Sequence, residues 1–509
     1  MFLPQMAYGS AKTTRQIIQF RGVRYGRGGG DGELAESLNL SSRQFPALSQ
    51  RRARAVVGTW ESPTAIFGKG KLCVVDGTKF LYNGEKVGDV TAGEKQIVSV
   101  NTKIVIWPDK KVYDTETKQF QDLGAKVSAT GVTFTENSLT MSGKNLDKLF
   151  EANQAVEITG SSIAANNKTL VVREVSSTKL TFYNGSFTAG SSTAEVTVER
   201  KIPDLKLICA SNNRVWGCDD TTIWASALGD PKTWYNYDGL STDSYAVAVG
   251  TDGAFTGCCA YGSNVLFWKE DVLHKVLGMQ PSEYQIYTYT VQGPKQGCHK
   301  SLQIINEVLY YLGVEGVYAY SGGTPLLVSE NFGTRRFQRA AAGTDGRRYY
   351  ISMQDGETGA WGLWTYDTVQ AIWLQEDATH AVDFTALNGD MLFLTGKTAF
   401  KTDQPDGAAD SPIRWSAAFY PMDETAHSRK GYSKLYLRME LSPGAWVKAE
   451  IREDAGPWVQ RAIVHGERRR TDTVTMIPGR CDTFQVRLSG EGRCVVKSLV
   501  REFDLGSEV

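Results

Sequence analysis

The sequence predicts an all-β protein: a β-propeller of about seven blades, or six, with a small inserted β-barrel domain and a C-terminal β-sandwich. Three observations predict this fold class. A turn–strand–turn–strand pattern recurs along the chain, one segment interrupts its spacing, and apolar residues of the C-terminal region alternate strictly with polar ones. At 509 residues the chain is too long for a single core, which favours about three domains.

Residues 1–55 differ from the rest of the chain. They are rich in Gly and Arg, carry nine Lys and Arg against three Asp and Glu, and lack the apolar content for a core of their own. Regularly placed apolar side chains nevertheless offer anchors, at Phe20, Val23, Tyr25, Leu38, Leu40, Phe45 and Leu48. We therefore expect an extended N-terminal arm that becomes ordered on a neighbouring subunit or on the propeller. A flexible tail is the alternative.

The repeats predict the blades. Each repeat has a turn marked by Gly, Asn, Asp or Ser, a short aromatic or β-branched strand, and a second turn and strand. Their starts are about 31 to 50 residues apart once one insertion is removed, a period typical of propeller blades. The repeats are Lys71–Val87, Thr102–Phe120, Asn213–Trp234, Ser263–Gly278, Asn306–Val328, Arg347–Gln375 and Gly389–Asp403. Residues 56–124 are therefore expected to form the first blades and residues 203–408 the others.

Residues 125–202 interrupt the blade spacing between Thr102 and Asn213. Short alternating stretches separated by Gly, Ser and Asn turns lie at Val156–Thr159, Leu170–Val175, Leu180–Tyr183 and Val196–Val198. They predict a small β-domain, a barrel or a sandwich. Because only loop tips normally accept such an insertion, we expect it to extend from a propeller loop.

Residues 409–509 follow a turn-rich linker. In residues 435–441 and 484–488 every second residue is apolar, which predicts strands with one buried face and one polar face. About seven or eight such strands fit into this region, enough for a jelly-roll-like β-sandwich. The outward positions carry many arginines.

Composition excludes several classes of partner. Lys plus Arg and Asp plus Glu are equal at 56 each, so no global field attracts nucleic acid or a membrane surface. No uncharged run reaches the length of a membrane-spanning helix, and the first residues lack the apolar core of a signal peptide. We expect synthesis in a cytosol. The eight Cys form no CxxC pair, which indicates reduced thiols in the core.

The sequence lacks most known catalytic and metal-binding motifs. The chain has no HExxH and no GxSxG, and its five His residues are far apart. We therefore expect no enzyme, and no catalytic, cofactor-binding or metal-binding residue, although a propeller funnel can still bring distant carboxylates together. Trp residues within the repeats either pack between blades or form a sugar-stacking surface, and their positions favour packing.

Several stretches of the chain together resemble a known family. The stretches that carry the resemblance are Asn213–Trp216, Thr222–Ser226, Gly229–Trp234, Cys258–Lys269, Phe20–Val23, Asn39–Ser42, Pro46–Leu48 and Arg51–Arg54. The resemblance is most specific in residues 206–280, which include the Gly-Asp-Pro-x-x-Trp sequence at Gly229–Trp234. The pattern resembles β-propeller virion proteins of tailed bacteriophages, including nozzle and packaged-DNA-stabilisation proteins. It covers roughly residues 15–405.

The resemblance implies a non-enzymatic structural protein that forms a homo-oligomeric ring in the neck or tail and docks neighbouring tail proteins. DNA would pass through the lumen without sequence-specific contact, and no membrane would be involved. The protein would be made in the host cytoplasm and end in the virion. The alternative is a carbohydrate- or receptor-binding propeller for host adhesion. Candidate subunit-contact residues are the arginines of the arm and the sandwich: Arg21, Arg24, Arg27, Arg51, Arg52, Arg54, Arg438, Arg452, Arg468, Arg469, Arg470 and Arg487.

Overall fold

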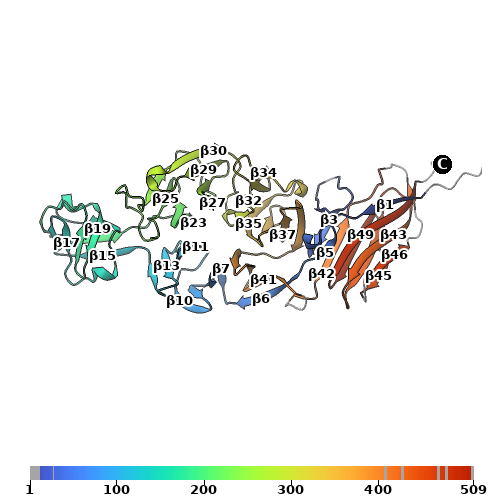
Figure 1. Cartoon of the computed structure of the whole chain (residues 1–509), viewed down its shortest axis with the longest axis horizontal. Coiled ribbons are helices and arrows are strands. Elements are labelled where there is room, and N and C mark those ends of the chain that lie inside the picture. The colour runs from blue at the N-terminus through green and yellow to red at the C-terminus, as the bar shows by residue number, and fades with distance from the viewer. Residues whose placement is uncertain are drawn as a thin grey trace, which may run out of the picture. The chain divides into compact units, whose positions relative to one another are not determined.

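The computed structural model describes residues 12–26, 28–405, 410–425, 429–466, 470–475 and 480–505 (Figure 1). Within these residues the regular structure is β-strand and short 3₁₀ helix, with no α-helix. The chain divides into two compact units. We call Glu61–Leu302 the central unit, and Met1–Trp60 together with Gln303–Val509 the terminal unit. The expected all-β class is confirmed.

The central unit contains four propeller blades, each a four-stranded antiparallel sheet of consecutive strands. The blades are β7 (Pro63–Lys69) to β10 (Glu85–Asp89), β11 (Gln96–Val100) to β14 (Phe120–Asp122), β23 (Leu207–Ser211) to β26 (Tyr245–Ala248), and β27 (Gly257–Tyr261) to β30 (Gln285–Thr290). Their inner members are β8 (Lys71–Asp76), β9 (Lys79–Tyr82), β12 (Lys103–Trp107), β13 (Lys111–Asp114), β24 (Arg214–Cys218), β25 (Thr222–Ala225), β28 (Asn264–Trp268) and β29 (Val272–Leu277).

The terminal unit contains three further blades. Two consist of consecutive strands: β31 (Gln303–Ile305), β32 (Val308–Leu312), β33 (Val317–Tyr320) and β34 (Leu326–Leu327), then β35 (Phe337–Thr344), β36 (Arg348–Asp355), β37 (Trp361–Asp367) and β38 (Ile372–Asp377). The third combines β39 (Asp383–Leu387), β40 (Asp390–Thr395) and β41 (Thr398–Gln404) with β6 (Ala53–Thr59) from the N-terminal region. Seven repeats thus correspond to seven four-stranded sheets, as the propeller prediction requires.

Asparagine sets the first hairpin of several blades. Asn101, Asn213, Asn306 and Asn388 have φ of 52°, 58°, 49° and 53° and lie between the first two strands of their blades. The left-handed region is accessible to Asn more readily than to other residues with a side chain, which explains the recurrence of this residue at the repeat turns.

Large aromatic side chains fill the space between neighbouring blades. Trp107 and Trp234, both 1% exposed, meet edge to face with ring centroids 6.2 Å apart in one apolar cluster. Trp216 packs in another cluster with strands of the blades β23–β26 and β27–β30. Trp268 and Trp373 are fully buried as well. For these residues the packing interpretation is confirmed.

The insertion forms an eight-stranded antiparallel sheet with its own core. The order is β15 (Ala125–Ala129), β22 (Val196–Arg200), β18 (Ala155–Thr159), β19 (Thr169–Val175), β20 (Lys179–Phe182), β17 (Ser138–Thr140), β16 (Thr133–Thr135) and β21 (Gly190–Ser191). Phe134, Phe182 and Val198 are among its buried residues. The predicted boundaries, 125–202, therefore enclose this domain.

The C-terminal sandwich consists of two sheets. One contains β49 (Cys494–Leu505), β43 (Lys430–Leu441), β46 (Arg470–Thr475) and β47 (Arg480–Cys481). The other contains β42 (Arg414–Phe419), β48 (Phe484–Glu491), β44 (Trp446–Glu453) and β45 (Val459–His465). Leu435 and Leu437 are 0% exposed, whereas the next residue, Arg438, is exposed. This difference confirms the alternation.

The N-terminal segment is ordered, as expected. It supplies strands to this sandwich and also packs against the propeller blade β35–β38, where the Tyr25 ring meets Trp364 edge to face and Ser42 donates to Asp367. Its docking on a neighbouring subunit stays a prediction. β1 (Thr13–Ile17), β4 (Leu40–Ser41) and β5 (Leu48–Gln50) join the first sheet, and β2 (Gly22–Val23) and β3 (Glu33–Leu38) join the second (Figure 1). The anchors explain the placement, because Phe20, Val23 and Leu40 are at most 3% exposed. Residues 409–509 alone are therefore not the complete sandwich.

Candidate functional site

The segment that links the sandwich to the last blade carries a run of arginines. It comprises β4, the 3₁₀ helix η1 (Ser42–Gln44), β5 and β6. Ser41 caps η1, because its Oγ accepts a hydrogen bond from the Arg43 backbone N–H at 3.3 Å. Leu40, Leu48 and Ala53 are buried and fix the path of the segment. Between these anchors, Arg43 contacts Asp345 and Asp403, and Arg51 contacts Asp410.

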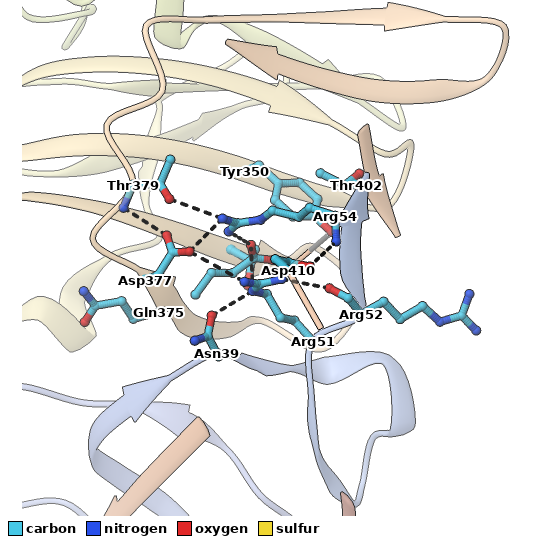
Figure 2. A network of polar contacts seen from close by, with 12 residues as sticks. Asn39, Arg51, Arg52, Arg54, Tyr350, Gln375, Asp377, Thr379, Thr402 and Asp410 are labelled. Atoms are coloured by element: carbon cyan, nitrogen blue, oxygen red, sulfur yellow. Dashed lines mark hydrogen bonds and ion pairs between the residues drawn. The ribbon is translucent and has the colours of Figure 1, made fainter. Parts of the chain in front are cut away.

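Arg54 lies at the centre of a buried polar network (Figure 2). Its Nη2 contacts Glu376 Oε2 and its Nη1 contacts Asp377 Oδ2, both at 2.7 Å. Nη1 also donates to Thr379 Oγ1 at 3.2 Å, and the guanidinium lies 5.1 Å from the centre of the Phe393 ring. A guanidinium with two carboxylates and an aromatic face is suited to burial, because its charge and most of its donors are matched.

Arg51 extends the same network. Its Nη1 contacts Asp410 Oδ2 at 2.8 Å, and its Nε donates to Asn39 Oδ1 at 2.7 Å. The other Asp410 oxygen accepts a hydrogen bond from the Arg54 backbone N–H at 2.7 Å. One carboxylate therefore ties together the two buried arginines. The side chain of Arg52, between them, extends away from the network in Figure 2.

The electrostatics keep these partners charged at neutral pH. Burial acts to raise the pKa of the Asp377 carboxyl, but the charge of Arg54 and hydrogen bonds from Arg54 and Thr379 outweigh it, so the pKa lies below its ordinary value. For Arg54, burial acts to lower the pKa, whereas the charges of Glu376 and Asp377 raise it, and the net pKa is raised.

A second cluster surrounds Arg43. Its guanidinium pairs with Asp345 at 3.0 Å and also with Asp403. Arg348 donates from Nη1 to Asp345 Oδ2 at 3.2 Å and from Nε to the Ser42 hydroxyl at 3.2 Å. Burial acts to raise the pKa of Asp345, but the backbone N–H groups of Arg348 and Arg347 and the charges of Arg348 and Arg43 lower it below its ordinary value.

Two adjoining cavities open beside these clusters. The first, of about 270 Å³, has Arg43, Arg51, Arg52 and Arg493 in its wall, with Asp403 as the carboxylate among the described residues; we call it the β49 cavity. The second, of about 380 Å³, is the β40 cavity. The two share Arg43, Gln44, Arg52 and Asp403, and the second adds Arg347, Arg348, Asp345 and Asp390. Together they are the arginine groove, the candidate binding site.

The structure corrects two of the predicted subunit-contact residues. Arg51 and Arg54 are 7% and 6% exposed and are paired within the chain, so the expectation that they form subunit contacts is wrong. Their carboxylate partners lie more than 300 residues away in sequence, which is why the local pattern suggested an outward position. Arg52 is exposed, as expected, and lines both cavities.

The other predicted arginines do not gather at one site. Arg21 and Arg438 are exposed. Arg24 pairs with Glu33 at 2.9 Å. Arg452 and Arg487 lie 4.9 and 4.5 Å from the Trp458 ring centre. Arg27, Arg468 and Arg469 lie outside the described residues, as does the side chain of Arg470 in β46.

Sequence reasoning missed Arg43, Arg347, Arg348 and Arg493, which also line the groove. The adjacent pair Arg347 and Arg348, at the start of β36, was the available signal. Among the described residues, no group of three or more His, Cys, Asp or Glu side chains could hold a metal ion. The helices of this part of the chain include none that could cross a membrane.

Comparisons with known proteins give little further information. No family model and no curated protein matches the chain. Among solved structures, the exo-β-1,3-galactanase of Phanerochaete chrysosporium aligns with a TM-score of 0.24 and 9% identity, over 56% of this chain and 92% of that chain. A family 43 arabinoxylan arabinofuranohydrolase from Bacillus subtilis aligns with a TM-score of 0.21 and 8% identity, over 88% and 96%.

Both of these structures are glycoside hydrolases. They contradict the sequence-based expectation that the chain is not an enzyme, and we withdraw that expectation. At these TM-scores they support no particular activity or substrate for this chain. The virion role stays a prediction from the sequence.

Proposed function

We propose that the chain is a structural protein of a tailed-bacteriophage particle that forms a homo-oligomeric ring in the neck or tail and docks neighbouring tail proteins. The observation that supports this proposal is the arginine groove. The wall of its β49 cavity has four guanidinium groups and one carboxylate among the described residues, at the surface of a unit held together by interleaved strands. A rigid basic recess is suited to an acidic surface on a neighbouring subunit.

The construction of the terminal unit supports the same proposal. The N-terminal strands pair with β49 and β42, and β6 completes the blade of β39 to β41. One chain segment thereby ties a blade to the sandwich through main-chain hydrogen bonds and the buried Arg54 network. A body that transmits load between neighbours in a particle needs this kind of cross-connection, because a docking surface on a loose tail would not hold its orientation.

The assembly state tests this proposal directly. The full chain is examined by negative-stain microscopy and by sedimentation velocity at low and high ionic strength. We expect closed rings at low ionic strength and folded, smaller species at high ionic strength, because charged contacts near the surface are screened by salt. A monomer at micromolar concentration under every salt condition would refute the ring.

A second candidate function, host adhesion through carbohydrate, is favoured by one observation. The His380 imidazole stacks on the Trp361 indole with ring centroids 3.6 Å apart and an interplanar angle of 18°, and His380 is exposed. A flat aromatic surface of this kind can hold the apolar face of a sugar ring. A glycan array probed with the full chain tests it. Binding that disappears in Trp361→Ala and remains in Arg52→Gln would favour adhesion over the groove-based role.

A further inference from the structure

Among the described residues of the arginine groove, Arg52 presents a guanidinium to a ligand. Arg348 and Arg51 are buried and paired, and Arg43 is held between Asp345 and Asp403. Arg52 is exposed, lines both cavities and points away from the buried network (Figure 2). A charged donor at the shared wall of two recesses is a place where a carboxylate or phosphate oxygen gains a charge-assisted hydrogen bond.

The second polar group in the same wall is the side-chain amide of Gln50. Gln50, beside Arg51, lines the β49 cavity, and its Oε1 is buried without a hydrogen-bond partner among the described residues. A buried acceptor of this kind is stabilised when its side chain turns into the cavity and a ligand brings an N–H to it. A peptide backbone supplies such a donor, whereas a phosphodiester group supplies only acceptors. The pair Arg52 and Gln50 therefore matches a carboxylate next to a peptide N–H.

The residues in the cavity walls also disfavour nucleic acid as the ligand. No aromatic side chain is among the described residues that line either cavity, so bases would find no stacking surface. Asp345, Asp390 and Asp403 lie in the wall of the β40 cavity and would repel a continuous chain of phosphates. A segment with separate carboxylates can place each one beside an arginine and keep clear of these aspartates.

From these contacts we infer that the arginine groove binds an extended acidic peptide segment, one Asp or Glu carboxylate at Arg52 and the adjacent backbone N–H at Gln50. The inference deepens the proposed function and rests on it for the source of the peptide, a neighbouring subunit of the particle. Three glutamines in the wall of the β49 cavity, Gln44, Gln50 and Gln404, offer further amide contacts to a peptide backbone.

Binding of short probes to the full chain tests the inference. The probe is a fluorescently labelled, capped hexapeptide of alternating Glu and Gly, and its control is the same peptide with Gln in place of Glu. We expect saturable anisotropy for the Glu peptide and none for the Gln peptide at the same concentrations. Arg52→Gln should weaken binding about 10- to 100-fold, the equivalent of one lost charge-assisted hydrogen bond. Arg173→Gln, an exposed arginine of the inserted domain, should leave binding unchanged.

Gln50→Met provides a variant whose failure to bind cannot be ascribed to misfolding. It keeps the length of the side chain and removes a buried, unpaired acceptor, so the melting temperature should stay constant or rise while peptide affinity falls. The inference is overturned if the Glu peptide does not bind, if both variants bind it normally, or if inorganic phosphate or a twelve-residue oligothymidylate displaces it at equal concentration. If rings form but the peptide does not bind, the peptide-binding inference is refuted and the proposed function stands. If the peptide binds but no rings form, the proposed function is refuted and the peptide-binding inference stands.

Discussion

Arg54 illustrates at the residue scale how burial decides the role of a charge. It donates to Glu376 and Asp377 and is 6% exposed, whereas Arg52, two residues earlier, is exposed. Both are arginines of the same basic run, and only the distant carboxylates distinguish them. Arg54 therefore stabilises the terminal unit, and Arg52 remains available for a partner.

Removal of the central guanidinium should destabilise the terminal unit strongly. Arg54→Met leaves Glu376 and Asp377 partly buried without their main partner, which should cost about 3–5 kcal/mol of unfolding free energy. Arg52→Met should change it by less than about 0.5 kcal/mol. Denaturant unfolding of the two variants measures the difference, and comparable losses would show that Arg54 is not the centre of the network.

His274 gives a pH-dependent prediction for the central unit. It lies 1% exposed between the hydroxyls of Thr251 and Thr288, at 2.8 and 2.9 Å. Burial, together with the charge of Lys269, lowers its pKa to about 4. Because this folded pKa lies below the unfolded value of about 6.5, the neutral ring is favoured by folding. Its contribution is complete above pH 6.5 and is lost as the pH falls towards 4.

Unfolding free energies at several pH values between 7 and 4 check this sign. The wild type should lose stability over that interval more steeply than His274→Asn, whatever the stability of the variant at pH 7. Parallel curves for the two proteins would mean that His274 does not titrate as its burial requires.

At the element scale, alternation along β43 separates two neighbouring residues. Leu437→Asp places an unpaired carboxylate in the sandwich core, which should cost several kcal/mol, on the order of 3–5. Arg438→Asp changes an exposed side chain and should leave stability almost unaltered. Thermal and denaturant unfolding of both variants measures the contrast. Equal effects would contradict the register of β43 between β49 and β46.

The N-terminal strands give a second prediction at this scale. Deletion of residues 1–55 removes strands from both sheets of the sandwich. It also removes the start of β6, where Ala53 and Ala55 pair with β41. The exposed edges of β49 and β42 should then unfold or aggregate. A truncated chain with the native melting temperature and circular dichroism would show that these strands are dispensable, as an appended arm would be.

How far the sequence predicts this structure depends on the distance between partners. The blades were predictable because each hairpin is local: a strand, an Asn such as Asn213 or Asn388, and the next strand. The pairing of β1 with β49 joins the two ends of the chain, and no local signal in Thr13–Ile17 specifies that partner. For the same reason a list of arginines could be read from the sequence, but the contact of Arg51 with Asp410 could not.

On the scale of the whole molecule, seven blades, an inserted domain and a sandwich provide several surfaces, and the arginine groove is the one to which the proposed docking role is assigned. Its β49 cavity is formed by η1, the segment around Arg51 and Arg52, and the ends of β41 and β49, and its β40 cavity adds residues within 345–348 and 389–391. Residues from the N-terminal segment, the last blade and the C-terminal strand thus meet at one recess. A docking site assembled in this way exists only when the terminal unit is fully folded.

Sedimentation velocity of charge-reversed variants tests the docking role of this groove most directly. Arg52→Glu places a negative charge at the shared wall of both cavities, and Arg173→Glu makes the same change on the inserted domain, where the arginine side chain is 47% exposed. At low ionic strength we predict that the wild type and Arg173→Glu sediment as rings, whereas Arg52→Glu sediments as a folded monomer. Rings of Arg52→Glu with the wild-type sedimentation coefficient would contradict the account.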